Sequence, residues 1–417
     1  MHTSQRLSLP LLSAMLVGVP VWWAWPGGLS GWREFAIVAG WVGYGLVFAS
    51  LVTMLREPRL ARWLGGLERM VVWHHRLGMA AYLVLLLHPA ALALATLPES
   101  PAIAWASLSP LQQGWPVWLG WASLLAMMVG LWTAISPRLP YARWRGLHGL
   151  LALSVVLALL HLIKLGLANW LLWVPVLAVA TLVWRVLRAD YGLGALPYVV
   201  SQVERAATAT VEISLRPMAR GITATAGQFI LVAFFKGPHF RGCGEYHPFT
   251  LTAIAPDGSL RIGVKALGDC TRHIQTIAPG VAARVQGGFG NFGAMDAGRP
   301  ALWIAGGIGI APFMALLRAG PPAMPVRLIY LYRDDHDACF LEELEALAAR
   351  YPRLTIVPRA TGDALPELPA LLPAPAALVD MRCALCGPPG LVDAAVTLLR
   401  GRGVPAEHIH FERFDFR

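Results

Sequence analysis

The residues best suited to chemistry in the amino-terminal half are four histidines in two long apolar stretches. His74 precedes His88 by 14 residues, and His148 precedes His161 by 13. An ionisable side chain inside a membrane is costly and usually functional, although a lone histidine in a helix can also simply hydrogen-bond a neighbour. Along a helix axis, the two histidines of the first pair lie about 21 Å apart, and those of the second pair about 20 Å apart. Imidazole pairs at two depths suit two bis-histidine haem groups, whereas a zinc site needs its ligands at one level.

Rotation around the helix axis constrains this interpretation. At 3.6 residues per turn, 14 residues bring His88 to within about 40° of His74, but 13 residues leave His161 about 140° away from His148. The second helix therefore needs a bulge, a kink or a tilt. The neighbouring His75 is an alternative ligand, and the spacing to His88 favours His74. We expect His74 and His148 to ligate one haem iron, and His88 and His161 the other.

Histidine ligands at two depths of a membrane require membrane-spanning helices, and the composition of the chain predicts such helices. Of the 417 residues, 56% are hydrophobic and 14% are charged, against about 25% charged in a typical soluble domain. Disorder, coiled coil and collagen are excluded. A signal peptide is the alternative for the first apolar stretch, but no clear cleavage site follows it. We predict six transmembrane helices of about 20 residues, at residues 7–25, 35–55, 70–95, 115–135, 147–167 and 170–187.

Arginines are concentrated in alternate connections between these stretches. Four lie between the second and third stretches and three between the fourth and fifth, while the other connections have few. Because basic loops stay on the cytoplasmic side, we expect a multi-pass protein of a bacterial-type inner (plasma) membrane, with both termini cytoplasmic. The haem of His74 and His148 is then the inner one. We attribute the net charge of +10 to this topology and to anion binding, and we expect no nucleic-acid partner.

After residue 198 the pattern changes to that of a soluble α/β protein. Four short segments separated by Gly, Pro and Asp turns, 208–215, 229–235, 249–255 and 260–265, predict a small antiparallel barrel. From about residue 299, strand and helix alternate, which predicts an open parallel sheet. The expected fold is a helical membrane bundle over residues 1–192, an antiparallel β-barrel domain over 193–297, and a Rossmann-like α/β domain over 298–417. All five cysteines lie in this cytoplasmic half, so no structural disulfide is expected.

A glycine-rich turn lies between a strand and a helix of the α/β domain, which is the context of a phosphate-binding loop. Gly306, Gly307 and Gly309 form this turn, and Pro312 stands where a dinucleotide fingerprint has its third glycine. Arg333 follows the next strand, at a position that meets the adenosine ribose in such folds. A guanidinium there suits the 2′-phosphate and favours NADPH over NADH, although a surface arginine is the alternative.

The sequence His247-Pro248-Phe249-Thr250 resembles a flavin-lining motif of the ferredoxin–NADP reductase superfamily. More closely, the chain resembles the membrane branch shared by ferric reductases and NADPH oxidases, including bacterial NADPH oxidases. The likeness covers nearly the whole chain. It includes the H-x13-H and H-x12-H pairs in the third and fifth spans and the G-x-G-x-x-P form of the glycine-rich turn.

The resemblance implies a flavin-binding barrel, an NADPH-binding α/β domain and the residues that serve them. FAD is expected at His247, Pro248, Phe249, Thr250, Lys265, Gly268, Thr271 and Phe414. Phe416 competes with Phe414 for the place over the flavin. NADPH is expected at Gly306, Gly307, Gly309, Pro312, Arg333, Cys386, Gly387 and Pro388. A helix beginning near Gly268 suits the flavin pyrophosphate. Cys383 and Cys386 form a C-x-x-C pair, which alone is a weak metal signal.

Together these cofactors define a path for electrons. NADPH would give a hydride to FAD, and single electrons would pass through the inner and then the outer haem to an acceptor outside. We expect no catalytic residue beyond the cofactor sites and no obligatory regulatory subunit. Dioxygen giving superoxide is favoured as acceptor, because the outer loops are short and hold no evident metal-binding cluster. The alternatives are a ferric or cupric chelate, a periplasmic redox partner fed by this subunit, and a transporter whose histidines relay protons.

Overall fold

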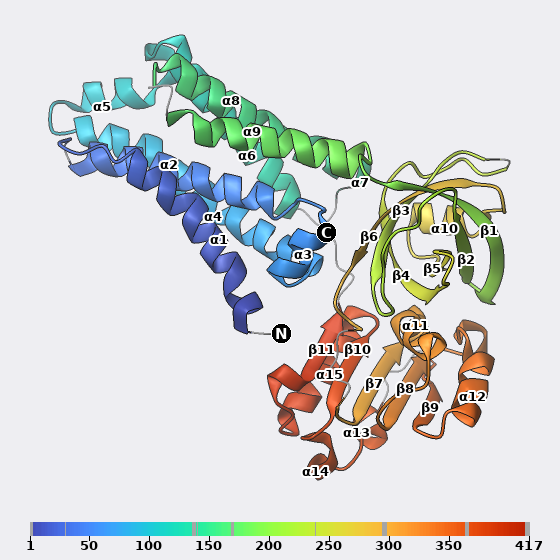
Figure 1. Cartoon of the computed structure of the whole chain (residues 1–417). Helices are drawn as coiled ribbons and strands as arrows, with labels where there is room; N and C mark the ends of the chain where they lie inside the picture. The colour runs from blue at the N-terminus through green and yellow to red at the C-terminus, as the bar shows by residue number, and fades with distance from the viewer. Residues whose placement is uncertain are drawn as a thin grey trace. The chain divides into compact units, whose positions relative to one another are not determined.

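The computed structural model describes residues 3–29, 31–135, 139, 141–167, 171–237, 239–293, 298–362 and 367–412 (Figure 1). The chain folds into two compact units. The helical unit comprises His2–Leu55 and Arg69–Tyr191. The carboxy-terminal unit comprises Gly192–Arg417 together with Arg56–Glu68, a segment that the sequence assigns to the membrane domain.

Long apolar helices build the helical unit, because their sequences hold few charges and few helix breakers. Its helices are α1 (Thr3–Trp23), α2 (Gly31–Val52), α4 (Leu67–Thr96), α5 (Pro101–Leu108), η1 (Pro110–Gln112), α6 (Trp115–Ile135), α7 (Tyr141–His148), α8 (Leu150–Lys164), α9 (Trp173–Arg185) and the π-helical turn η3 (Val186–Asp190). Helices therefore stand at all six predicted spans. Among the described residues, four are long and apolar enough to cross a membrane: Gly31–Val52, Leu67–Thr96, Trp115–Thr133 and Arg143–Lys164.

The first and last predicted spans are shorter as observed. The apolar part of α1 runs over Leu7–Trp23, and α9 has 13 residues before the backbone changes to a π-helical turn. The fifth predicted span is interrupted between α7 and α8 at Gly149. There Ala152 N–H bonds back only three residues, to the Gly149 carbonyl at 3.0 Å. This tightening lies between His148 and His161, where the spacing requires an irregularity.

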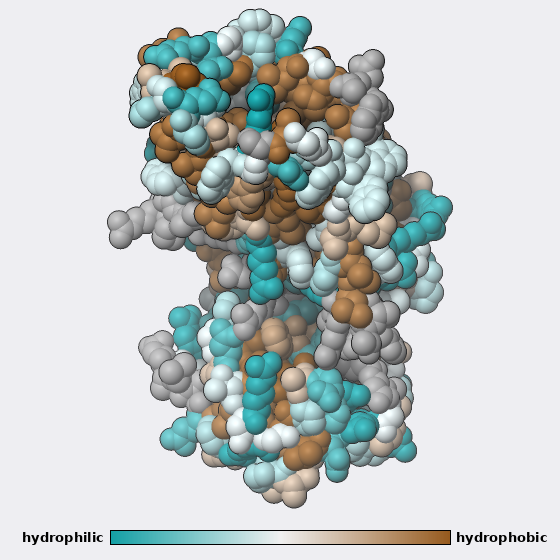
Figure 2. Space-filling model, turned by 90° about the vertical axis from the view of Figure 1, so that its left-hand side faces the viewer, coloured by the Kyte–Doolittle hydropathy of each residue, from teal (hydrophilic) through white to brown (hydrophobic). Residues whose placement is uncertain are grey.

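The surface of the helical unit is apolar. Figure 2 shows hydrophobic side chains, in brown, on the face of this unit that it presents. Trp22 is 80% exposed, Trp132 63% and Leu83 57%. Exposed apolar patches of this kind suit lipid better than water, and tryptophans near helix ends suit the membrane interface.

Inside the unit, helices approach through small and hydroxyl residues. Ser123 Oγ of α6 donates to the Ser154 carbonyl of α8 at 2.8 Å. A side chain at Gly45 of α2 would lie 2.9 Å from the Cα of Val17 in α1, so glycine permits close contact. Both are devices of helix packing in membranes, where hydrophobic association is weak.

The carboxy-terminal unit begins with a closed antiparallel barrel of strand order β1-β2-β5-β4-β3-β6. Its strands are β1 (Leu196–Ala207), β2 (Thr210–Pro217), β3 (Phe229–Phe234), β4 (His247–Ile254), β5 (Leu260–Lys265) and β6 (Ala282–Phe289). Alternate side chains fill the interior, among them Ile213, Phe234 and Leu251. The short helix α10 (Asp269–Ile274) follows β5 and buries Ile274 in this core. The predicted antiparallel barrel is confirmed.

A parallel five-stranded sheet of order β11-β10-β7-β8-β9 comes next in the chain. Its strands are β7 (Ala301–Gly306), β8 (Val326–Tyr332), β9 (Leu354–Ala360), β10 (Arg382–Cys386) and β11 (Ile409–Glu412). Its helices are η4 (Gly307–Ile310), α11 (Ala311–Ala319), η5 (Asp335–Asp337), α12 (Leu341–Arg350), α13 (Leu368–Leu371), α14 (Pro375–Leu378), α15 (Pro389–Gly401) and η6 (Ala406–His408). Apolar cores cover both sheet faces, and the predicted parallel sheet is confirmed.

An ion-pair network, buried at Glu212, joins the barrel to the α/β domain. Arg318 of α11 bonds Glu212 of β2 at 2.6 Å and Glu343 of α12 at 2.6 Å. Glu212 also accepts from the hydroxyl of Thr252 in β4. The pKa of Glu343 is lowered by its hydrogen bond to Arg318. Because Glu212 is only 4% exposed, this network fixes α11 against the barrel wall.

The segment between α2 and α4 also belongs to this unit. It contains α3 (Pro58–Leu64), which packs on β6 of the barrel. Ala61 and Leu64 of α3 are buried. The domain boundaries predicted from the sequence stay predictions, but this loop is part of the carboxy-terminal compact unit.

Candidate cofactor-binding sites

His88 and His161 lie close enough for their charges to interact. The Nδ1 atom of His88 is 2.7 Å from the Ala36 carbonyl of α2. The Nδ1 atom of His161 is 2.8 Å from the Pro116 carbonyl of α6. Since a carbonyl only accepts, each Nδ1 carries the proton, and Nε2 keeps its lone pair for a metal.

Glycines on the facing helices make room for these two rings. A Cβ at Gly40 of α2 would lie 3.2 Å from Nδ1 of His88. A Cβ at Gly120 of α6 would lie 3.0 Å from the His161 ring. Both contacts are tighter than ordinary van der Waals packing, so a larger residue would push the ring away.

His74 and His148 form the second pair. Their ring centroids are 6.3 Å apart. The Nδ1 atom of His74 lies 2.8 Å from Ser50 Oγ and 3.2 Å from the Ser50 carbonyl. The His148 ring stacks on Trp144, with centroids 4.9 Å apart. His75 touches the His74 ring at 5.7 Å between centroids.

The separation between His74 and His148 fits one of the two haem groups expected from the sequence. Two metal–imidazole bonds of about 2 Å each, plus the two ring radii, give a centroid separation of about 6 Å. The 6.3 Å between His74 and His148 matches that span. Metal-bound histidines usually donate their second ring N–H to a carbonyl or another oxygen, and His74, His88 and His161 each have such a partner.

In the carboxy-terminal unit the two expected nucleotide loops lie against one another. A Cβ at Gly309 would be 2.3 Å from the Cys386 carbonyl, and one at Gly306 would be 2.9 Å from Pro388 Cδ. A Cβ at Gly387 would lie 3.1 Å from the Cα of Gly306. The glycines are therefore required because the two backbones touch.

The position of this contact in the sheet is significant. The loops follow β7 and β10, which are adjacent and parallel. The chain leaves β7 towards β8 on one side, and β10 lies on the other side. In open α/β sheets, ligands bind outside the carboxyl ends of strands at such a switch point. Gly307 has a φ of 53°, and Pro312 is buried in the first turn of α11.

Arg333 lies directly after β8, outside the carboxyl end of that strand, and is 61% exposed. Its guanidinium is 3.2 Å from Asp337 and 3.7 Å from Asp334. Lys265 also pairs with Asp337, at 3.8 Å. A nucleotide phosphate here would meet Arg333 already engaged with carboxylates.

The flavin motif occupies the start of β4. Phe249 is buried in the barrel core beside Phe234, with ring centroids 6.5 Å apart. Pro248 and Thr250 alternate onto the other face of the strand. The pKa of His247 is lowered by burial, against an opposing effect of Glu245. The imidazole is therefore held neutral.

The expected pyrophosphate turn begins α10. The hydroxyl of Thr271 accepts from the amides of Leu267 at 2.9 Å and Gly268 at 2.8 Å, and donates to the Gly268 carbonyl at 3.1 Å. It therefore caps its own turn. The flavin roles of these residues remain predictions, and Phe414 and Phe416 lie outside the described residues.

Glu412, at the end of β11, is a candidate that the sequence analysis missed. Its carboxylate is 4% exposed, and neither oxygen has a hydrogen-bond partner among the described residues. It pairs in register with Cys386. Burial, and then the charge of Glu68, hold the pKa of Glu412 well above its usual range. Burial and Glu412 likewise raise the pKa of Cys386. No local pattern marks this residue in the sequence, because β11 has only 4 residues and its pairing with Cys386 depends on the fold.

Comparisons with known proteins match three successive parts of the chain. Residues 39–159 match the family described as ferric reductase like transmembrane component. Residues 197–324 match an FAD-binding domain, and residues 303–397 match an oxidoreductase NAD-binding domain.

Individual relatives match the carboxy-terminal half. Ferredoxin–NADP reductase B from Sorangium cellulosum is 30% identical, over 41% of this chain and 80% of its own length. The toluate 1,2-dioxygenase electron transfer component from Pseudomonas putida is 26% identical over 52% of this chain. The chain spans 66% of that relative, less than two thirds. A solved flavohem-like FAD/NAD binding domain of nitric oxide dioxygenase from Vibrio cholerae is 21% identical, with a TM-score of 0.46 over 52% of this chain and 98% of that one.

The fold and these matches define a class of protein. Through its FAD- and NAD-binding domains, the chain belongs to the ferredoxin–NADP reductase family. Because a ferric-reductase-like transmembrane component precedes these domains, its architecture is that of the ferric reductases and NADPH oxidases. The resemblance inferred from the histidine spacing and the HPFT motif is confirmed.

Proposed function

We propose that the protein carries electrons from cytosolic NADPH, through FAD and two b-type haems, across the bacterial inner membrane to dioxygen on the outer side. NADPH supplies two electrons. Each turnover would release NADP⁺ and one proton and convert two dioxygen molecules into two superoxide ions. When bound, FAD would accept the hydride and pass on single electrons, which the haems would carry through the apolar layer.

The observation that carries this proposal is the pairing of His74 with His148 at 6.3 Å between ring centroids. Two imidazoles at that distance leave room for one metal ion between them. Since the His74 ring is anchored through Nδ1 to Ser50, its Nε2 is the atom available to iron. We assign the inner haem to His74 and His148 and the outer haem to His88 and His161, within a bundle of six transmembrane helices.

In the carboxy-terminal unit, the backbone positions the nicotinamide nucleotide. The loop after β7 would bind its phosphates, and the Cys386–Pro388 turn after β10 would face the nicotinamide. Arg333 would bind the 2′-phosphate of NADPH by exchanging an exposed carboxylate partner for it, which favours NADPH over NADH. His247 and Thr250 of β4, with the turn at Gly268, would orient FAD.

Superoxide formation is supported by the absence of an evident metal-chelate site in the outer loops of the sequence, because outer-sphere transfer to dioxygen needs no ligands. A second candidate is a ferric-chelate reductase, which the description of the transmembrane family favours. A third is electron supply to a separate redox enzyme, since a relative is named as an electron transfer component. All three candidate functions use the same proposed path from NADPH through FAD and the two haems.

The test uses the full chain purified in detergent with added FAD. Anaerobic NADPH should reduce the flavin and then produce the spectrum of reduced b-type haem. Admission of air should reoxidise the haem with superoxide formed. If air does not reoxidise the reduced haem but ferric citrate does, the acceptor is a ferric chelate and not dioxygen. Protein without haem would overturn the membrane half of the proposal.

A further inference from the structure

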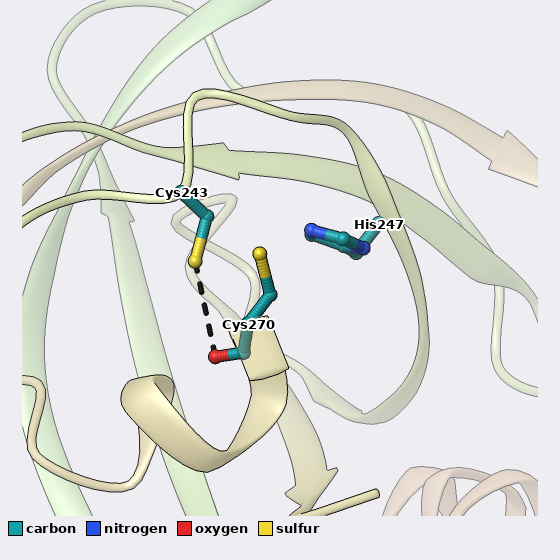
Figure 3. Close-up of side chains that lie close together, drawn as sticks. All are labelled: Cys243, His247 and Cys270. Atoms are coloured by element: carbon teal, nitrogen blue, oxygen red, sulfur yellow. Dashed lines mark hydrogen bonds between the residues drawn. The ribbon is translucent and has the colours of Figure 1, made fainter. Parts of the chain in front are cut away.

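Two cysteines and a histidine converge at one end of the barrel, and two of the three, Cys243 and Cys270, have no role in the electron path described above. The ligand atoms of Cys243, His247 and Cys270 all lie within 4.8 Å of one another. Figure 3 shows the three side chains pointing toward a common space, and the thiol of Cys243 donates to the Cys270 carbonyl at 3.8 Å. No local pattern in the sequence marks this group, because its members lie on three separate elements.

The backbone fixes the loop that presents Cys243. The amides of Cys243 and Gly244 both donate to the Phe234 carbonyl, at 3.0 and 3.2 Å. Gly242 and Gly244 have φ values of 76° and 63°, which side-chain-bearing residues rarely adopt. A Cβ at Gly242 would also lie 2.8 Å from the Lys236 amide. The loop is thus built tightly around Cys243.

The other two members stand on regular elements. His247 begins β4 and pairs in register with Val232 of β3. Its Nε2 atom is buried without a hydrogen-bond partner among the described residues. Cys270 lies in α10, which is anchored by the burial of Ile274 in the barrel core. Three rigid supports therefore aim one nitrogen and two sulfur atoms at the same space.

We propose that Cys243, His247 and Cys270 bind a soft divalent cation of the Zn²⁺ class. Zinc accepts thiolate and imidazole ligands at about 2.0–2.3 Å in tetrahedral geometry, which places ligand atoms about 3.6–3.8 Å apart. The observed separations need to contract by at most about 1 Å. Thiolate ligands select against Mg²⁺ and Ca²⁺. The three side chains are half-buried, so the fourth position is open to water.

Because zinc binds cysteine as the thiolate, the cation would displace protons from the two sulfur atoms on binding.

The metal would compete with FAD. This consequence rests on the proposed function, in which His247 and the turn at Gly268 orient the flavin. An imidazole bound to zinc cannot also contact FAD, and Cys270 lies within that turn. The site is thus an inhibitory one, closed when flavin is bound and filled when flavin is lost.

The experiment uses the full chain in detergent, freed of FAD and kept reduced. Dialysis against Zn²⁺ followed by elemental analysis should give one zinc per chain, a count that haem does not disturb. Co²⁺ should give thiolate-to-cobalt charge-transfer bands in the difference spectrum. Cys243→Ser, Cys270→Ser and His247→Gln should each weaken binding at least tenfold. The matched control Cys339→Ser removes a buried cysteine elsewhere and should bind like the parent.

Several results would overturn the site. Zinc retained at full stoichiometry in the double variant Cys243→Ser/Cys270→Ser would do so, as would equal loss in Cys339→Ser. A Cys243–Cys270 disulfide in place of metal binding, found by thiol counting, would also contradict it. Adding FAD to the cobalt-loaded chain should bleach the charge-transfer bands, and bands that persist with FAD bound would refute the competition. If FAD binds neither the metal-free nor the loaded chain, the proposed function fails while the cobalt result stands.

Discussion

In the helical unit the candidate ligands are side chains, whereas in the carboxy-terminal unit the nucleotide loops are bare backbone. His88 and His161 are oriented by carbonyls of neighbouring helices and admitted by glycines opposite them. At the sheet, positions 306 and 309 require glycine because the loop after β10 lies directly against them. A haem iron needs side-chain ligands at fixed positions, and a nucleotide phosphate needs backbone amides that come close. The two units should therefore fail independently when mutated.

The largest effect should come from loss of a haem ligand. His74→Ala is expected to remove the inner haem and abolish electron transfer to the outer side, while NADPH still reduces the flavin. The matched control is His75→Ala, which should retain both haems. Haem content by pyridine haemochrome and anaerobic flavin reduction separate the two functions. If His75→Ala loses haem and His74→Ala does not, the ligand assignment is wrong.

A bulky residue at position 309 should impair only the carboxy-terminal unit. In Gly309→Val, the new side chain would start 2.3 Å from the Cys386 carbonyl, so the two loops must separate. We expect NADPH-dependent flavin reduction to fall at least about 100-fold, or about 2.7 kcal/mol, with haem content unchanged. Gly390→Ala in α15 is the control, because nothing lies within 4 Å of its Cβ. Simultaneous loss of haem would show that the units are coupled.

The ion-pair network predicts a stability effect confined to the carboxy-terminal unit. Arg318→Met removes the 2.6 Å partner of buried Glu212 and leaves Arg261, at 3.5 Å, as its remaining cationic partner. We expect a cost of about 3 kcal/mol, at the low end for a broken buried ion pair. Arg272→Met removes an exposed pair with Asp269 and should cost less than about 1 kcal/mol. Urea unfolding without added FAD, monitored by proteolysis of the carboxy-terminal unit, measures both costs. Equal losses in the free energy of unfolding for the two variants would mean that the network does not fix α11 against the barrel.

Nucleotide choice should respond more weakly to Arg333. Arg333→Ala is expected to lower the ratio of kcat/KM for NADPH over NADH about tenfold, or about 1.4 kcal/mol. Arg359→Ala, at a position on the neighbouring strand β9, serves as control. An unchanged ratio would identify Arg333 as a surface arginine paired only with Asp334 and Asp337.

The smallest effect concerns the pH dependence of stability. Because the pKa of Glu412 is raised by folding, the native state binds a proton more tightly than the unfolded chain. The contribution of Glu412 to the stability of the folded state is fully present below the unfolded pKa of about 4.3. It is lost as the pH rises towards the native pKa. Glu412→Gln should flatten the decline in Tm between about pH 5 and 8. A parent and variant with parallel profiles would contradict this.

Features that depend on local pattern could be predicted from the sequence. The apolar stretches placed helices at all six expected sites, and the four regular barrel strands and the central sheet strands were found. β1 and β6 were missed, because β1 alternates irregularly along its 12 residues and β6 contains two adjacent glycines. β11 is only 4 residues long, too short to show a period. Strand order in the sheet emerges only from tertiary packing.

The same distinction between local sequence pattern and tertiary packing applies to the candidate site residues. The histidine spacing and the glycine-rich turn are local, so they could be read from the sequence. The contact between Gly309 and Cys386 joins segments 77 residues apart, and no local pattern reports it. The convergence of Cys243, His247 and Cys270 likewise depends on how α10 is placed against the barrel. The docking of α3 on β6 was not foreseen, because a basic loop between two spans reads as a topology signal alone.

Transfer of electrons through the membrane is tested most directly in sealed vesicles. The full chain is reconstituted with cytochrome c trapped inside and with NADPH and FAD added outside, so that only inserted molecules with outward-facing nucleotide domains receive NADPH. We predict reduction of the trapped cytochrome, carried by superoxide and therefore suppressed by superoxide dismutase trapped with it, and lost in His74→Ala but not in His75→Ala. NADPH oxidation that reduces only acceptors outside the vesicles, at the same rate in His74→Ala, would contradict it.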